Sequence, residues 1–132
     1  MFGPVLGTVL NILDAAQILE QAYPYVRSYL DPPKSIDELQ SAVRNPSKGC
    51  EIHHIVEQAA AERDGFPRSL IDSPENPVRI PTLKHWEINA WYQTKNEEYG
   101  GVTPRQYLHG KDWATRVRVG RSALIAVRVL EP

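Results

Sequence analysis

The sequence predicts an α+β fold that is mostly helical, and three observations support this prediction. Apolar residues recur at helical spacing over long segments, helix-capping residues open several of those segments, and two short β-branched runs indicate strands. A chain of 132 residues with 42% hydrophobic content suits one soluble globular domain. We expect the strands to be few and the helices to surround them.

The first predicted element is a helix over residues 5–22. The apolar residues that follow its helical spacing are Val5, Leu6, Val9, Leu10, Leu13, Ala16 and Leu19. Asp31-Pro32-Pro33 interrupts the chain after it. Ser35 and Glu38 then have the spacing of a capping box that opens a short helix, which Asn45-Pro46 ends.

Two short strands and a long connection are predicted next. Residues 50–56 contain three β-branched residues and predict the first strand, and residues 77–80 predict the second. Pro81 ends the second strand. Residues 57–75 form a long loop with a helical turn at 58–63, and a loop of this length in a small domain is often functional.

Helices are predicted after the second strand. Thr82 is the expected cap of a helix that continues to Tyr99 and ends at Gly100-Gly101. Thr103, followed by proline, opens a short helix that ends at Gly110.

Asp112 is the expected cap of the last helix. The residues expected to face inward are Trp113, Val117, Leu124 and Val127. The alternation of Arg and Val over residues 116–119 leaves a strand as an alternative there.

Composition and targeting signals narrow the function classes. A formal net charge of −1 argues against a protein that holds nucleic acid by overall positive charge. Cys50 is the single cysteine, which excludes an internal disulfide and a Cys-x-x-Cys zinc site. The sequence has no apolar run of membrane-spanning length, and its start lacks the basic region of a secretory signal peptide. If the protein leaves its cell, we expect it to do so without a conventional leader, as one piece of a larger delivered chain.

Three of the four histidines fall into one pattern. His53 and His54 are adjacent on the first predicted strand, where neighbouring side chains point to opposite faces. His85 lies in the first turn of the helix after the second strand, and Asn89 follows it by one helical turn. Hydrolysis of a phosphodiester needs a base for water and a divalent ion for the developing charge. This set supplies one base and up to three ligands.

The chain resembles the HNH nuclease motif, also called the His-Me finger or ββα-metal motif. The matching segments are Glu51-Ile52-His53-His54-Ile55-Val56-Glu57-Gln58, Asn76-Pro77-Val78-Arg79-Ile80-Pro81 and Lys84-His85-Trp86-Glu87-Ile88-Asn89. Residues 103–130 also resemble the segment that follows the motif in bacterial toxin nucleases. The resemblance is nearest to the AHH/GHH/LHH-type toxin domains of bacterial polymorphic toxins and more distant to nuclease colicins. It covers residues 50–130 and implies a ββα-metal core in a nuclease domain over 49–132. Residues 1–48 are expected to be a helical extension or linker.

The resemblance implies a role for each matched residue. His54 would be the general base, with Glu51 orienting the site and Asn76 tying the loop to the strands. His53 and His85 would bind the metal ion. The third ligand position, Asn89, is a histidine in the colicin-like members, and this departure favours Mg²⁺ or Mn²⁺ over Zn²⁺ or Ni²⁺.

Basic residues are concentrated near the C-terminus. Residues 102–132 hold six basic and two acidic residues, a net charge of +4, so residues 1–101 carry −5. This end of the chain is a candidate for contacts with the DNA backbone, and solvated arginines on an amphipathic helix are an equal alternative. The candidate contact residues over the whole motif are Arg68, Arg79, Lys84 and Arg116.

These expectations combine into one function. The site residues and the resemblance together predict a metal-dependent, largely non-specific DNA endonuclease. The resemblance further implies an interbacterial effector toxin that is made in a bacterial cytoplasm, is delivered by a specialised secretion system and has a cognate immunity protein as partner. A phage- or repair-type HNH nuclease without a toxin role is one alternative. A non-enzymatic protein-interaction module, in which the histidines form a structural cluster, is the other.

Overall fold

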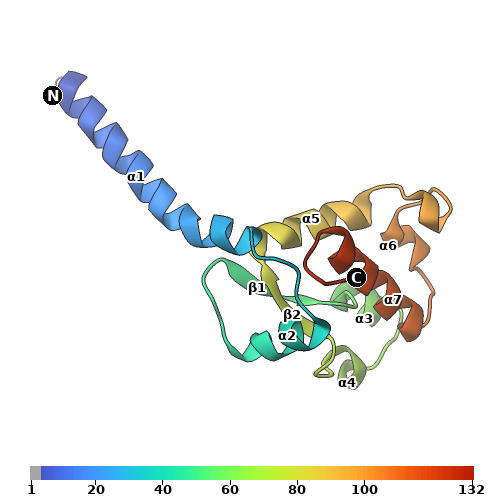
Figure 1. Cartoon of the computed structure of the whole chain (residues 1–132). Coiled ribbons are helices and arrows are strands. Elements are labelled where there is room, and N and C mark those ends of the chain that lie inside the picture. The colour runs from blue at the N-terminus through green and yellow to red at the C-terminus, as the bar shows by residue number, and fades with distance from the viewer. Residues whose placement is uncertain (1–3) are drawn as a thin grey trace.

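The computed structural model describes residues 4–132, with side chains from Asp14 onward. In this part of the chain a two-stranded antiparallel sheet is surrounded by helices (Figure 1), so the α+β and mostly helical prediction is confirmed. The helices are α1 (Pro4–Tyr29), α2 (Ile36–Ser41), α3 (Gln58–Arg63), α4 (Arg68–Ile71), α5 (Thr82–Gln93), α6 (Pro104–Tyr107) and α7 (Trp113–Ala126). The strands are β1 (Cys50–His54) and β2 (Pro77–Pro81). Two 3₁₀ turns cover Ala42–Arg44 and Glu97–Tyr99.

The sheet register fixes which side chains share a face. Glu51 pairs with Ile80, and His53 pairs with Val78. Directly paired residues of antiparallel strands point to the same face. His53 and Glu51 therefore lie on the buried side of the sheet with Val78 and Ile80, which are fully buried.

The core lies between the sheet and the helices α5 and α7. Its largest fully buried side chains include Ile80 from β2, Ile88 and Tyr92 from α5, and Leu124 from α7. A side chain of this kind contributes roughly 1.5–3 kcal/mol when it is buried. A smaller cluster of Val56, Ala61 and Ile71 lies under the connection between the strands.

Two glycines permit close approaches between elements. A Cβ on Gly120 of α7 would overlap the carbonyl oxygen of Ile55, so α7 lies directly against the chain that leaves β1. Gly49 has a φ of +90°, and a Cβ there would lie 2.5 Å from the carbonyl oxygen of Pro24. Glycine therefore sets both contacts.

The N-terminal segment has two parts. α1 projects from the body as a rod (Figure 1), and its last turns attach to the body through Ser28, whose Oγ donates to the carbonyl of Gly49 at 2.9 Å. Leu39 of α2 is buried in the main core. Residues 24–44 thus pack with the segment that resembles a nuclease. None of the described helices is long and apolar enough to span a membrane.

Several predicted boundaries are confirmed. Both capping boxes form: the Ser35 hydroxyl accepts from the N–H of Glu38, and the Thr103 hydroxyl accepts from the N–H of Gln106. Asp112 caps α7 through the N–H of Thr115.

Other boundaries are corrected. Thr82 is the first residue of α5 and not its cap, which is Pro81. α5 ends at Gln93 and not at Tyr99, because Thr94 is extended and Asn96 caps the following 3₁₀ turn. Residues 116–119 belong to α7, from which Val119 packs in the core, so the predicted last helix is confirmed and its strand alternative is wrong. β1 ends at His54 and not at Val56.

Candidate functional site

Three side chains of the predicted site meet between β1 and the start of α5. The rings of His53 and His85 lie with their centroids 5.0 Å apart in an edge-on arrangement. A carboxylate oxygen of Glu51 contacts Nδ1 of His85. The alternation of β1 places Glu51 and His53 on the face that α5 covers, and His85 is in the first turn of that helix.

His53 has an unusual environment for an imidazole. The residue is 5% exposed, and its Nε2 is buried without a hydrogen-bond partner in the described part of the chain. Burial, with smaller contributions from His85 and His54, lowers the pKa of His53 to about 3. The ring is therefore neutral at pH 7 and offers a lone pair that the protein leaves unused.

These side chains fit a divalent ion in three respects. A neutral imidazole is a metal ligand, and an unpartnered buried nitrogen is an unfavourable arrangement unless something binds it. Glu51 occupies Nδ1 of His85, which leaves Nε2 as the nitrogen of that ring able to bind an ion. A carboxylate on the second nitrogen of a ligating histidine is a common way to orient it.

Asn89 is exposed on α5, one turn beyond His85. Among the described residues, no group of three or more His, Cys, Asp or Glu side chains has the arrangement of a metal site. An ion at His53 and His85 would complete its coordination with water or substrate oxygens.

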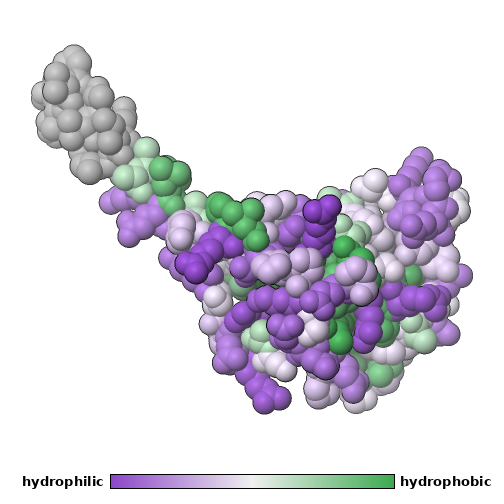
Figure 2. Space-filling view, viewed as in Figure 1, coloured by the Kyte–Doolittle hydropathy of each residue, from purple (hydrophilic) through white to green (hydrophobic). Residues whose placement is uncertain are grey.

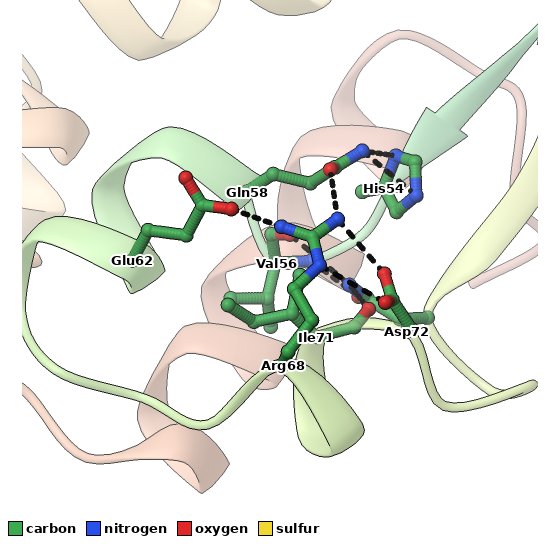
Figure 3. A network of polar contacts seen from close by, with 8 residues as sticks. His54, Val56, Gln58, Glu62, Arg68, Ile71 and Asp72 are labelled. Carbon is green, nitrogen blue, oxygen red and sulfur yellow. Dashed lines mark hydrogen bonds and ion pairs between the residues drawn. The ribbon is translucent and has the colours of Figure 1, made fainter.

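His54 lies in a polar network built by the connection between the strands (Figure 3). The Gln58 amide nitrogen lies 2.8 Å from Nδ1 and 2.9 Å from Nε2 of His54. The Gln58 oxygen accepts from Nη2 of Arg68 at 2.9 Å, and this bond orients the amide with its N–H groups toward the imidazole. Arg68 is itself held by a bidentate pair with Asp72 and by a contact with Glu62.

Burial lowers the pKa of His54, while Asp72 raises it and Arg68 lowers it. The net direction favours the neutral ring, which has a lone pair for a proton. The sequence did not assign a role to Gln58 or Asp72. Gln58 begins α3 while His54 ends β1, so neither helical nor strand spacing relates the two residues, and the sequence held no signal for their contact.

Asn76 acts on the backbone rather than on a ligand. Its Oδ1 accepts from the N–H of Val56 at 2.8 Å. Its Nδ2 donates to the carbonyl oxygens of Val56 at 3.2 Å and Ile71 at 2.9 Å. The amide thus takes the backbone groups of Val56 out of the sheet ladder, which is why β1 ends at His54, and it ties the connection to the strands as expected.

Two candidate nucleic-acid contacts are wrong because the side chains are buried. Arg116 is 2% exposed, and its guanidinium is paired with Asp64 and with the carbonyl of Lys111. Lys84 is 9% exposed. Its Nζ lies 4.3 Å from the centre of the Tyr29 ring and 3.7 Å from a carboxylate oxygen of Glu87.

The side chains of the other two contact candidates are more exposed, but each is bonded to neighbouring groups of the protein. Arg68 is half-exposed and paired with Glu62 and Asp72, and Arg79 donates to the carbonyl of Asn45. The exposed basic residues of α7 are Arg118 and Arg121. Together with Lys111 and Arg128, which are exposed outside this helix, they carry the basic character of the C-terminal region on the surface.

Comparison of the chain with protein-family models, with curated proteins and with solved structures finds no match.

Proposed function

We propose that this protein is a metal-dependent DNA endonuclease in which His54 activates the attacking water. The observation that carries the proposal is the buried, unpartnered Nε2 of His53 beside His85, with Glu51 on the other nitrogen of His85. A protein-interaction module has no need of an unsatisfied imidazole in its interior. The order Glu-x-His-His, Asn and His along the chain, as in the HNH motif, adds to this support.

His53 and His85 are the residues that would hold a divalent ion. The ion would supply charge stabilisation for the phosphorane and for the leaving oxygen. Glu51 keeps the His85 ring in place, and burial keeps His53 neutral, so both rings are ready to bind. Imidazole nitrogens suit Mn²⁺, Ni²⁺ and Zn²⁺, while open positions filled by oxygen suit Mg²⁺ and Mn²⁺.

His54 would take the proton from water. The neutral ring carries a lone pair on one of its two nitrogens, and the Gln58 N–H, which only donates, bonds to that nitrogen. Water takes the place of the Gln58 amide at that nitrogen and loses its proton to it. The oxygen of the water then bonds to phosphorus, the bond from phosphorus to the 3′ oxygen breaks, and that oxygen leaves with a proton from solvent.

Plasmid cleavage with separate additions of Mg²⁺, Mn²⁺, Zn²⁺ and Ni²⁺, and with EDTA as the blank, tests the proposal. We expect His54→Ala to lose at least about a hundredfold in cleavage rate, since general-base catalysis contributes 10² to 10⁴-fold. His109→Ala is the matched control, because the His109 side chain is 80% exposed and outside the site. Full activity of His54→Ala would refute the mechanism.

Calorimetric metal titration separates the enzyme from the non-enzymatic alternative. We expect His53→Ala and His85→Ala to lose metal binding and His54→Ala to retain it. Metal binding without cleavage of DNA or RNA by the unaltered protein would support a structural histidine cluster instead.

The toxin role is a separate part of the proposal and depends on the motif resemblance. We propose a cytoplasmic target, delivery by a specialised secretion system and a tight immunity partner with an acidic surface that suits Arg118 and Arg121. Induced expression in bacteria tests it: we expect growth arrest with the unaltered chain and normal growth with His54→Ala. Normal growth with an active nuclease would favour a phage- or repair-type enzyme.

A further inference from the structure

The rod formed by α1 exposes large apolar side chains. The exposed fractions are 71% for Leu19, 61% for Tyr23, 49% for Val26 and 73% for Leu30. Figure 2 shows hydrophobic surface on the part of the rod that it colours, next to the body. A helix of 26 residues is about 39 Å long, and isolated helices are marginally stable in water.

Eight apolar positions of this rod follow a heptad, while Leu6, Leu10, Leu13 and Ile18 lie outside it. The eight positions alternate at intervals of four and three residues from the start of α1 to one residue past its end. We call this set the heptad seam, and its members are Val5, Val9, Ile12, Ala16, Leu19, Tyr23, Val26 and Leu30. An apolar period of 3.5 residues is typical of a helix that supercoils around another helix of the same period.

The heptad seam is not the face by which α1 attaches to the body. That attachment uses Ser28, which bonds to Gly49, and Tyr29, whose hydroxyl donates to Glu87 at 2.6 Å. The seam residues near the body stay exposed while Ser28 is buried. The body therefore holds the rod in place with its seam turned to solvent.

We infer that the heptad seam pairs α1 with α1 of a second copy of this chain in a two-stranded coiled coil. Within the described residues, the next longest helix is α7 with 14 residues, and it packs in the core, so none of the described helices covers the seam. The seam contains no charged residue. Glu20 and Arg27 flank it with opposite charges, so two copies do not repel each other there. An isologous pair with two-fold symmetry buries the same stripe on both copies.

Light scattering after size exclusion tests the pairing on the full chain, without a cleavage assay. From about 1 to 100 µM, we expect the mass to rise from 14.9 kDa toward twice that value. Leu19→Lys places a charge in the seam and should raise the dissociation constant by more than about tenfold, a change of 1.4 kcal/mol. Since Leu19 is 71% exposed, the body keeps its fold, which circular dichroism checks.

Ile18→Lys is the matched control, because Ile18 is 64% exposed on the same helix and lies outside the seam. We expect this variant to dimerise like the unaltered chain. A monomer at every concentration would overturn the inference. Equal loss of association in both lysine variants would also overturn it, because it would indicate non-specific apolar association.

Discussion

Replacement of Asn76 should be among the most destabilising single changes outside the apolar core. The residue is 3% exposed, and its amide uses its acceptor oxygen and both N–H groups on backbone partners at 2.8, 3.2 and 2.9 Å. Asn76→Ala leaves the N–H and carbonyl of Val56 and the carbonyl of Ile71 without these bonds. Each hydrogen bond contributes about 1 kcal/mol net, and an unsatisfied buried group costs about 1–3 kcal/mol.

Three lost bonds therefore predict a decrease of about 3 kcal/mol in the free energy of unfolding, which is large against the 5–15 kcal/mol typical of a domain. Urea unfolding followed by circular dichroism measures it, with an unchanged m value as the sign of an intact native state. Asn76→Asp keeps the acceptor for Val56 but cannot donate, so it should be destabilised as well. Asn89→Ala, on the exposed face of α5, is the control and should change stability by less than about 0.5 kcal/mol. A loss below about 1 kcal/mol in Asn76→Ala would show that the amide does not hold the connection.

Further predictions concern one titration and two packing contacts. In the unfolded chain the imidazole of His53 binds a proton below about pH 6.5, and in the folded protein it does so only near pH 3. The free energy of unfolding in EDTA should therefore fall as the pH drops from 6.5 toward 3, by about 2 kcal/mol at pH 5. In His53→Leu this part of the pH dependence should vanish. Gly120→Ala should lower the free energy of unfolding by about 1–3 kcal/mol, because the added methyl group overlaps the carbonyl of Ile55. This loss should exceed the gain from the better helix propensity of alanine. A neutral or stabilised variant in urea unfolding would contradict this close approach. Arg116→Met leaves a carboxylate unpaired and should lower the urea midpoint clearly more than the exposed control Arg118→Met, and equal midpoints would mean that the buried ion pair has no net effect.

Local signals in the sequence predicted the secondary structure well where one residue decides a boundary. Ser35, Thr103 and Asp112 cap helices because each side chain bonds to an N–H three residues ahead, which needs no tertiary partner. The end of β1 was different. Ile55 and Val56 have strand propensity, but Asn76, twenty residues later, takes the backbone groups of Val56. A contact at that separation leaves no signal in the local pattern.

The candidate site divides in the same way. The spacing of His53, His54 and His85 predicted that one histidine would meet the helix and one would face elsewhere, since strand alternation requires it. The distance between the rings, the orphan nitrogen and the contact of Glu51 with His85 depend on how α5 packs on the sheet. Arg116 shows the limit: a basic residue among other basic residues predicted a solvated or DNA-facing side chain, and burial beside Asp64 reversed that.

The sequence by itself determined the helical class, the caps and the order of the motif residues, because each of these is a property of residues a few positions apart. Only the tertiary structure decided which basic side chains are buried and how Arg68 holds Gln58 against His54. It also decided that the body leaves the heptad seam exposed. These contacts join residues that are distant in sequence or sit on different faces of one element. Their geometry depends on how all the core side chains pack together, so no single segment of the sequence determines it.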